Sequence, residues 1–174
     1  MPTLRHLLLT LLLCSGLVQA SQAEDDLALK VKAAYVFHLV KFVDWPGLPP
    51  DSLHICVTGS DAMSEMLGEL ANRQVKDRTL RIERGVPSDL AICQILFIGR
   101  AEKQWSSLLS RAGGLPVLTV SDLEDFARKG GVVGFYSEAG KIRLEINPDT
   151  ARKAELRISA KLMEVARTVP AAQE

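Results

Sequence analysis

Apolar residues recur with a helical period in the segment that precedes the first proline-rich stretch. Ala33, Val36, Phe37, Val40 and Val43 stand at positions i, i+3, i+4, i+7 and i+10, which fall on one side of a helix. We therefore expect an amphipathic helix over residues 25–44. The stretch "DWPGLPP" should end it, because proline disfavours helical geometry in the residue before it and glycine breaks what remains.

Beyond residue 50 the pattern changes to short apolar runs separated by helical segments. The run "CQILFIG" is apolar throughout, which is typical of a central parallel strand. In "TGSDAM" and "SDLE" polar residues precede helical patterns, and Ser121 stands three residues before Glu124 as in a capping box. The predicted strands cover 53–59, 78–84, 93–99 and 115–120. The predicted helices cover 61–72, 101–114 and 121–131.

After residue 131 the strands no longer alternate with helices. Two β-like runs within 132–147 surround Glu138-Ala139-Gly140, which predicts a hairpin. Closing helices are expected over 148–155, with Pro148 at the start, and over 159–169, with Ser159 as the cap. The whole series indicates a single α/β domain with a mixed, mostly parallel sheet flanked by helices and a C-terminal antiparallel hairpin.

The first 23 residues have the pattern of an export signal. Basic Arg5 precedes an apolar run from Leu7 to Val18, and small residues stand at Ala20 and Ala23. The apolar run is shorter than the roughly 18–20 residues that span a bilayer. We expect a signal peptide over 1–23, with a cut after Ala20 as the alternative, a domain over 24–170 and a loose tail over 171–174.

Charge excludes one class of partner. The chain has 21 basic and 21 acidic residues, and loss of the signal peptide removes only Arg5. Such a balance gives no electrostatic footprint for DNA or RNA, so no nucleic-acid partner is expected.

Cys56 and Cys93 are the cysteines that remain once Cys14 is removed with the signal peptide. Export carries them to a compartment in which disulfides persist, and an even number suits a pair. Two separate buried thiols are the alternative. Only His38 and His54 remain as histidines, and there is no C-x-x-C motif, so neither a zinc site nor a dithiol oxidoreductase is expected.

Motifs of catalysis and cofactor binding are missing from the sequence. There is no dinucleotide or P-loop fingerprint and no nucleophile elbow, so we expect no catalytic residues, no cofactor and no enzymatic activity. Thr58, Gly59 and Ser60 join a strand to a helix, a place where an anion can bind, although a plain turn is the commoner outcome. The region of Arg157 is a second candidate for ligand binding.

Three large apolar residues are candidates for contact with a protein partner. They are Trp45, Leu48 and Trp105. Aromatic and apolar side chains flanked by polar ones often anchor interfaces. Packing in the core or at its rim is the alternative for each of them.

Several segments, in order along nearly the whole mature chain, resemble the YfiR-like family of periplasmic proteins. The most specific are the aromatic first helix that ends in W-P, the strand "CQILFIG" and the tail "KIRLEIN…LRISAKLMEVA". The other matching segments are "ICVTG" and "VLTVSDLEDFARKGGVVGFY".

The resemblance implies a periplasmic, non-enzymatic repressor that responds to redox state. Such a repressor binds the periplasmic domain of an inner-membrane diguanylate cyclase and keeps it off, which lowers cyclic-di-GMP and biofilm output. An OmpA-like outer-membrane lipoprotein sequesters the repressor and relieves the block. Other relatives serve sensor kinases or transport systems, and homodimers are common in the family.

The resemblance also bears on the cysteines. Cys56 and Cys93 match the pair that forms the family's structural disulfide. A second disulfide near the C-terminus has no counterpart, because no cysteine follows Cys93. Redox switching through that second bridge therefore cannot operate in this chain.

Overall fold

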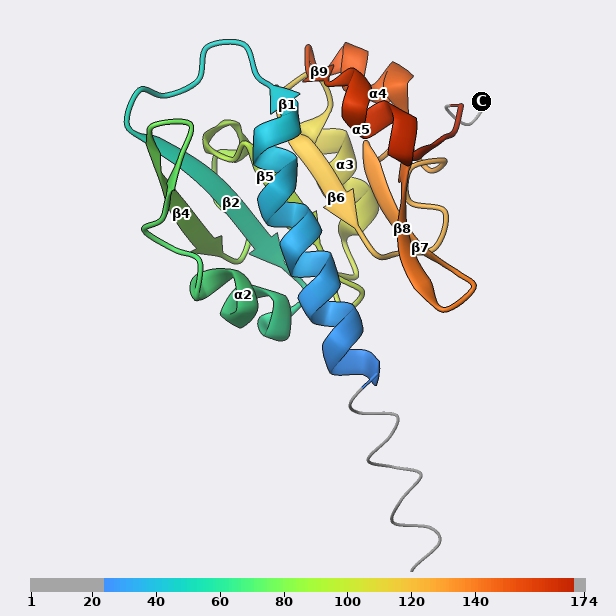
Figure 1. The fold of residues 1–174 in the computed structure, drawn as a ribbon. Coiled ribbons are helices and arrows are strands. Elements are labelled where there is room, and N and C mark those ends of the chain that lie inside the picture. Colours follow the sequence, from blue (N-terminus) through green and yellow to red (C-terminus); the bar gives the residue numbers. More distant parts are fainter. Residues whose placement is uncertain (1–23, 171–174) are drawn as a thin grey trace, which may run out of the picture.

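The computed structural model describes residues 24–170 (Figure 1). The predicted signal peptide, residues 1–23, and the predicted tail, residues 171–174, lie outside the described residues. Within the described range the chain folds as a mixed sheet with helices on both faces, as the sequence predicts.

A helix over residues 24–42 crosses one face of the sheet and is drawn in blue in Figure 1. Its apolar stripe, which includes Ala33, Val36 and Val40, is buried, so the predicted helix is confirmed up to residue 42. The last two residues of the prediction instead form strand β1 (Val43–Asp44), which pairs antiparallel with β9 (Arg157–Ile158).

The main sheet has the strand order β10-β8-β7-β6-β5-β2-β4-β3. Neighbours run parallel except in the pairs β7–β8 and β3–β4, which confirms a mostly parallel sheet with a C-terminal hairpin. The long strands are β2 (Ser52–Thr58), β4 (Arg78–Arg84), β5 (Ile95–Ile98), β6 (Leu118–Ser121), β7 (Val133–Glu138) and β8 (Lys141–Ile146). The two edge strands are β3 (Gln74–Val75) and β10 (Arg167–Thr168).

Short helices connect the strands, and polar side chains begin several of them. The helices are α2 (Asp61–Gly68), α3 (Trp105–Ala112), α4 (Pro148–Lys153), α5 (Ala160–Val165) and the 3₁₀ turn η1 (Leu90–Ile92). Ser60, Asn147 and Ser159 each accept hydrogen bonds from backbone N–H groups in the first turn that follows them. The predicted cap Ser159 and the initial Pro148 are thus confirmed.

The predicted helix over 121–131 is wrong, because these residues form irregular turns. Ser121 does not cap a helix: its hydroxyl donates to the Ile98 carbonyl oxygen and accepts from the Leu123 N–H. The Asp122 carboxylate accepts from Lys32 of the N-terminal helix at 2.7 Å. Asp125 has a φ of 56°, which a right-handed helix does not permit. Tertiary contacts have overridden the local helical pattern.

Other boundaries also differ from the prediction. The helix expected over 61–72 ends at Gly68, and the helix expected over 101–114 covers only Trp105–Ala112. The strand expected over 93–99 begins at Ile95, since Cys93 closes η1. The helix expected over 159–169 ends at Val165, and Ala166 takes an extended conformation that turns Arg167 and Thr168 into β10 beside β8.

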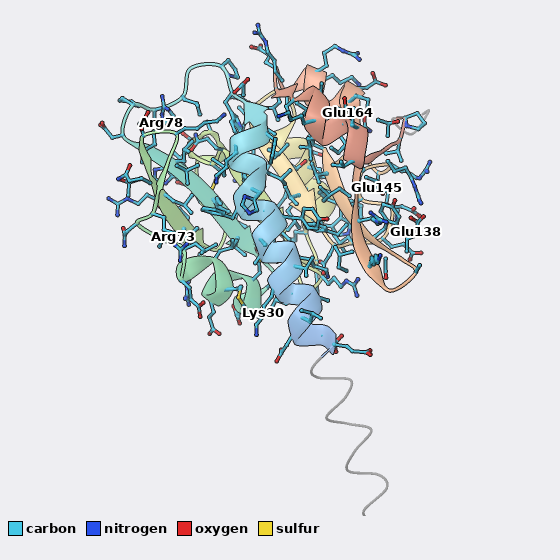
Figure 2. The ribbon with its side chains drawn as sticks, in the orientation of Figure 1. Lys30, Arg73, Arg78, Glu138, Glu145 and Glu164 are labelled. Atoms are coloured by element: carbon cyan, nitrogen blue, oxygen red, sulfur yellow. A yellow bond between two sulfur atoms is a disulfide. The ribbon has the colours of Figure 1, made fainter. Side chains whose placement is uncertain are left out.

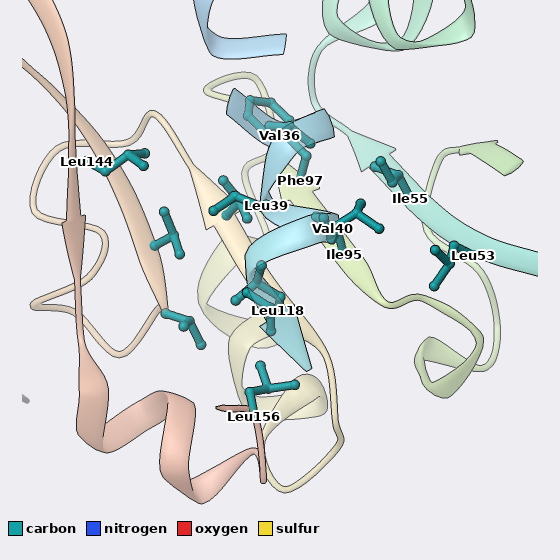
Figure 3. Close-up of a cluster of buried hydrophobic side chains, with 14 of the residues drawn as sticks. Val36, Leu39, Val40, Leu53, Ile55, Ile95, Phe97, Leu118, Leu144 and Leu156 are labelled. Atoms are coloured by element: carbon teal, nitrogen blue, oxygen red, sulfur yellow. The ribbon is translucent and has the colours of Figure 1, made fainter. Parts of the chain in front are cut away.

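Alternation along β5 divides the core into two clusters. Ile95 and Phe97 point to the N-terminal helix, whereas Leu96 and Ile98 point to the opposite side. We call the first side the helix-covered face; Figure 3 shows Val36, Leu39, Val40, Leu53, Ile55, Ile95, Phe97 and Leu118 packed together there. We call the second side the bridge face; its buried residues are Cys56, Leu90, Cys93, Leu96, Ile98, Leu108, Ala112, Val117 and Phe126.

Candidate functional site

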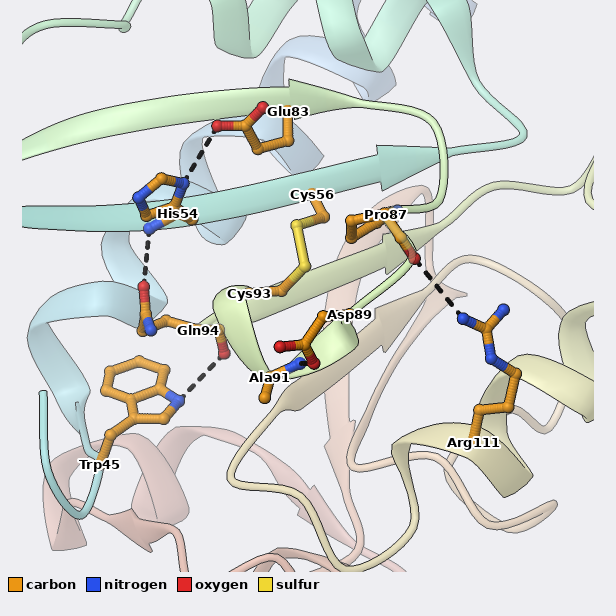
Figure 4. Close-up of a disulfide and its surroundings, with 10 residues drawn as sticks. All are labelled: Trp45, His54, Cys56, Glu83, Pro87, Asp89, Ala91, Cys93, Gln94 and Arg111. Carbon is orange, nitrogen blue, oxygen red and sulfur yellow. Dashed lines mark hydrogen bonds and ion pairs between the residues drawn. A yellow bond between two sulfur atoms is a disulfide. The ribbon is translucent and has the colours of Figure 1, made fainter. Parts of the chain in front are cut away.

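Cys56 and Cys93 form a disulfide on the bridge face (Figure 4). The bond joins β2 to the end of η1, with the two Cα atoms 5.8 Å apart, and neither side chain is exposed. The predicted pairing is therefore present, and the alternative of two separate thiols is set aside. Cys93, however, lies before β5 rather than on it.

Gln94 follows Cys93 of the disulfide, and its hydrogen bonds join parts of the chain that lie far apart in the sequence. The sequence does not identify it as a site residue. Its backbone carbonyl accepts the indole N–H of Trp45 at 3.0 Å, and its Oε1 accepts the backbone N–H of His54 at 2.7 Å (Figure 4). The side chain is 6% exposed. No local motif marks such a residue, because its partners are 40 and 49 positions away.

A cleft of about 520 Å³ opens where β1 pairs with β9. We call it the Trp45 cleft; its lining residues are Asp44, Trp45, Pro46, Arg152, Glu155, Leu156 and Arg157. The cleft exists because the antiparallel register places Asp44 opposite Arg157. Two residues predicted for separate roles, Trp45 for a partner and Arg157 for a ligand, thus line one depression.

The walls of the Trp45 cleft combine apolar groups with charges of both signs, because Asp44 and Glu155 line it together with Arg152 and Arg157. Trp45 is 8% exposed, so it forms part of the core instead of projecting as a free anchor. Arg157 is exposed, and Arg152 donates to Asp149 at 2.9 Å on the flank of α4. Tryptophan and arginine are the residue types most enriched at the centres of interfaces.

The other predicted anchors lie on different parts of the core. Leu48 is half-buried and packs against the helix-covered cluster, which also contains Trp45. Trp105 is half-buried at the start of α3 and packs against the bridge-face cluster. The structure therefore does not bring the three side chains into one surface patch.

The groups of the turn Thr58-Gly59-Ser60 are already engaged within the chain. The Thr58 hydroxyl donates to Glu102 Oε2 at 2.7 Å, and Ser60 caps α2. Gly59 has a φ of 66°, and a Cβ at this position would lie 2.8 Å from the Gly99 carbonyl oxygen. The Glu102 carboxylate would repel an anion here, so the predicted anion site gains no support.

Hydrogen bonds also explain the acidity of Glu102. The Thr58 hydroxyl, and after it the Gln104 N–H, stabilise the carboxylate and hold the pKa of Glu102 below its usual range. Desolvation acts in the opposite direction and is the smaller influence.

Ser52, His54 and Glu83 form a hydrogen-bonded row that sequence reasoning missed. Ser52 Oγ lies 3.0 Å from His54 Nε2, and Glu83 Oε1 lies 3.0 Å from His54 Nδ1. This is the order of groups in a catalytic triad. A hydrolase also needs N–H groups that stabilise an oxyanion. The backbone N–H of His54 already donates to Gln94 Oε1 and does not serve this purpose. We assign no reaction to the row, which ties β2 to β4.

No helix within residues 24–170 has the length and apolar character needed to cross a membrane. The same residues hold no cluster of three or more His, Cys, Asp or Glu side chains placed to bind a metal ion.

The disulfide-bridged α/β fold thus carries a cleft whose lining is partly apolar and partly charged, with both signs present. The family model described as YfiR/HmsC-like matches residues 29–167. The chain therefore belongs to this family, which is periplasmic and regulatory, and it is in general terms a regulator of diguanylate cyclase signalling. A comparison with curated proteins finds no match.

Proposed function

We propose that this protein represses an inner-membrane diguanylate cyclase by binding its periplasmic sensor domain, which lowers cyclic-di-GMP and biofilm output. The family match over residues 29–167 is the observation that carries the proposal. The export pattern of residues 1–23 supports it, because the partner domain lies across the inner membrane.

Repression requires the regulator to prefer one state of its partner. A bound protein can hold a cyclase off only by binding the inactive state more tightly than the active one. A shift from mostly active to mostly inactive needs about 5 kcal/mol of such preference.

The Trp45 cleft is the surface that we propose for this contact. Its rim carries Pro46 and Arg157, and the buried Trp45 indole forms a rigid wall fixed by Gln94. Leu48 packs against the same core cluster as Trp45. Trp105 packs against the other cluster, so it would contact the partner only through a second surface. An OmpA-like outer-membrane lipoprotein that competes for the regulator, and a homodimer, belong to the same proposal.

Gene deletion combined with matched complementation tests the proposal. Deletion should raise cellular cyclic-di-GMP, and the full chain should restore it, whereas a form that lacks residues 1–23 should not. Arg157→Glu should fail to restore repression, because it reverses the charge at the cleft rim. Arg73→Glu, an exposed reversal outside the cleft, is the control and should complement fully.

A small-molecule accessory of a sensor kinase or transport system is the second candidate. The volume of the Trp45 cleft, about 520 Å³, lies within the range of small-molecule sites and favours this alternative. An unchanged cyclic-di-GMP level on deletion, with no cyclase recovered by the tagged protein from detergent-solubilised membranes, would overturn the cyclase assignment in favour of this one.

A further inference from the structure

A second depression lies where the bridge face meets α4, because its lining includes Ala112 and Val117 of the bridge face and Val132 and Ala154 of the other cluster. It has a volume of about 610 Å³ and is bounded by α3, by the turn at residues 128–130 and by the side of α4 that carries Thr150 and Lys153. We call it the α3–α4 groove. None of the seven residues that line the Trp45 cleft lines this groove, so the two are separate sites.

The floor and one wall of the α3–α4 groove are apolar. Val117 and Val132 form the floor; both are buried, and they lie just before β6 and β7. Trp105 and Leu109 form the wall from successive turns of α3 and are only half-buried. An aromatic or aliphatic body placed between floor and wall would remove apolar surface from water.

The rim of the groove is cationic. Arg128, Lys129 and Lys153 line it, and no aspartate or glutamate is among the lining residues. Two carboxylates lie near this rim: Arg128 Nε is 4.0 Å from Asp125 at the surface, where ion pairs are weak, and Glu124 lines an adjoining depression with Trp105 and Lys129.

The single sign of charge in this lining differs from the Trp45 cleft, which is lined by Asp44 and Glu155 as well as by Arg152 and Arg157. Figure 2 shows both signs spread over the exterior, with Lys30 and Arg73 on some elements and Glu138 and Glu164 on others. A chain with a net charge near zero has no general excess of cations to place in one depression. The groove is therefore locally complementary to a negative ligand.

Glycines keep one edge of the groove low. Gly114 has a φ of 80° and Gly130 a φ of 101°, and open space surrounds the position of a Cβ at each. The backbone at this edge thus carries no side chain that would close the depression, and a ligand can reach the floor.

We propose that the α3–α4 groove binds a small amphiphilic anion. Its apolar body lies against Trp105, Leu109 and the two valines, and its carboxylate or phosphate lies between Lys153 and Arg128. The volume argues for a small molecule, because depressions of 300–1,000 Å³ are the usual size of such sites (about 610 Å³ here). The proposal does not depend on the cyclase assignment.

Indole resonances give a direct test, because the chain has two tryptophans and they lie in different places. Naphthaleneacetate is titrated into ¹⁵N-labelled protein, and naphthylmethylammonium, an aromatic probe of opposite charge, is titrated in parallel. The Trp105 indole N–H resonance should shift and reach saturation as naphthaleneacetate is added. The Kd of naphthylmethylammonium should be at least about tenfold higher. The Trp45 indole N–H, held by Gln94 outside the groove, should not move.

Charge reversals locate the binding. Lys153→Glu and Arg128→Glu should each weaken binding of naphthaleneacetate about tenfold, while the control reversals Arg73→Glu and Arg157→Glu leave it unchanged. In the Lys153→Glu, Arg128→Glu and Arg73→Glu variants, which lie outside the Trp45 cleft, an unmoved Trp45 indole resonance reports that the fold is intact. The proposal is overturned if Trp105 does not respond, if anion and cation bind equally, if Lys153→Glu has no effect or if Arg157→Glu abolishes binding.

Discussion

The two faces of the sheet are stabilised in different ways. On the helix-covered face a helix of more than four turns lies across the strands, and large side chains such as Leu39, Leu53 and Phe97 are buried beneath it. On the bridge face the cover consists of η1, the eight-residue α3 and irregular turns, and a disulfide joins the cover to the sheet.

On the helix-covered face the burial of apolar surface is enough to hold the cover on the sheet. On the bridge face a covalent bond also contributes. A long amphipathic helix removes enough apolar surface from water to hold itself on the sheet. Short elements bury less each, so the bridge face relies on the Cys56–Cys93 bond to keep η1 and β5 in register with β2. The thinner cover also leaves the α3–α4 groove open.

Loss of the disulfide should have the largest effect on stability. The bond closes a loop with a separation of 37 residues, which corresponds to about 4 kcal/mol in the chain-entropy description. The variant Cys56→Ala/Cys93→Ala should lose that amount of unfolding free energy in urea, and reductant should lower the stability of the natural chain alone. Hydrogen exchange should rise over residues 90–112 more than over 30–42; an equal rise would contradict the division into two faces.

Leu39→Ala tests the helix-covered face. The side chain is 1% exposed, so its truncation leaves a cavity beneath the helix and should cost about 3 kcal/mol in urea unfolding. Leu27→Ala on the same helix is the control: Leu27 is 63% exposed, and the change should stay within about 0.5 kcal/mol. Similar losses for both variants would mean that the helix is not held by its buried stripe.

Trp45→Phe tests the link between the two faces. The change keeps the aromatic ring but removes the N–H that reaches the Gln94 carbonyl. That carbonyl keeps its bond to the Leu118 N–H, so the loss of one buried hydrogen bond should cost about 1 kcal/mol. Trp105→Phe, in which the half-buried indole lines the groove, should cost less. The two losses are compared by urea unfolding, and the reverse order would show that the Gln94 bond contributes little.

Glu102 gives the smallest effect, seen only in acid. Its folded pKa is lower than its unfolded value near 4.5, so its contribution is complete above that value and is lost as the pH falls through the folded pKa. Thr58→Val should raise the Glu102 pKa towards its usual range, as followed by carboxyl-carbon NMR, because it removes the strongest hydrogen bond. An unchanged titration would exclude the Thr58 hydroxyl as the cause.

The sequence correctly predicts those elements in which the local residue pattern and the tertiary contacts favour the same structure. The run around Ile95–Ile98 and the hairpin around Ala139 are read correctly, because apolar continuity and turn residues dictate the same structure locally and globally. Residues 121–131 are misread, since the Ser121 hydroxyl is taken by the Ile98 carbonyl and Asp122 by Lys32, two partners that no local pattern reveals.

The candidate sites are harder to predict than the fold. The Trp45 cleft depends on the pairing of two short strands, β1 and β9, which places Asp44 opposite Arg157. These residues are more than a hundred positions apart in the sequence. The α3–α4 groove collects its cations from two separate segments, at residues 128–129 and 153. The disulfide was accessible to sequence reasoning, because export and cysteine number limit the pairing to one possibility.

The Cys56–Cys93 bond turns part of the chain into a closed ring that contains α2, β3, β4 and η1. The loop between β4 and η1 lies within this ring, and its residue Val86 is exposed to attack by a protease. A single cut there opens the ring but does not divide the protein, because the two sulfur atoms still join the pieces. After a single cut within residues 56–93 the two pieces separate only when the disulfide is reduced, so the bond protects this part of the chain against a single cleavage by a protease.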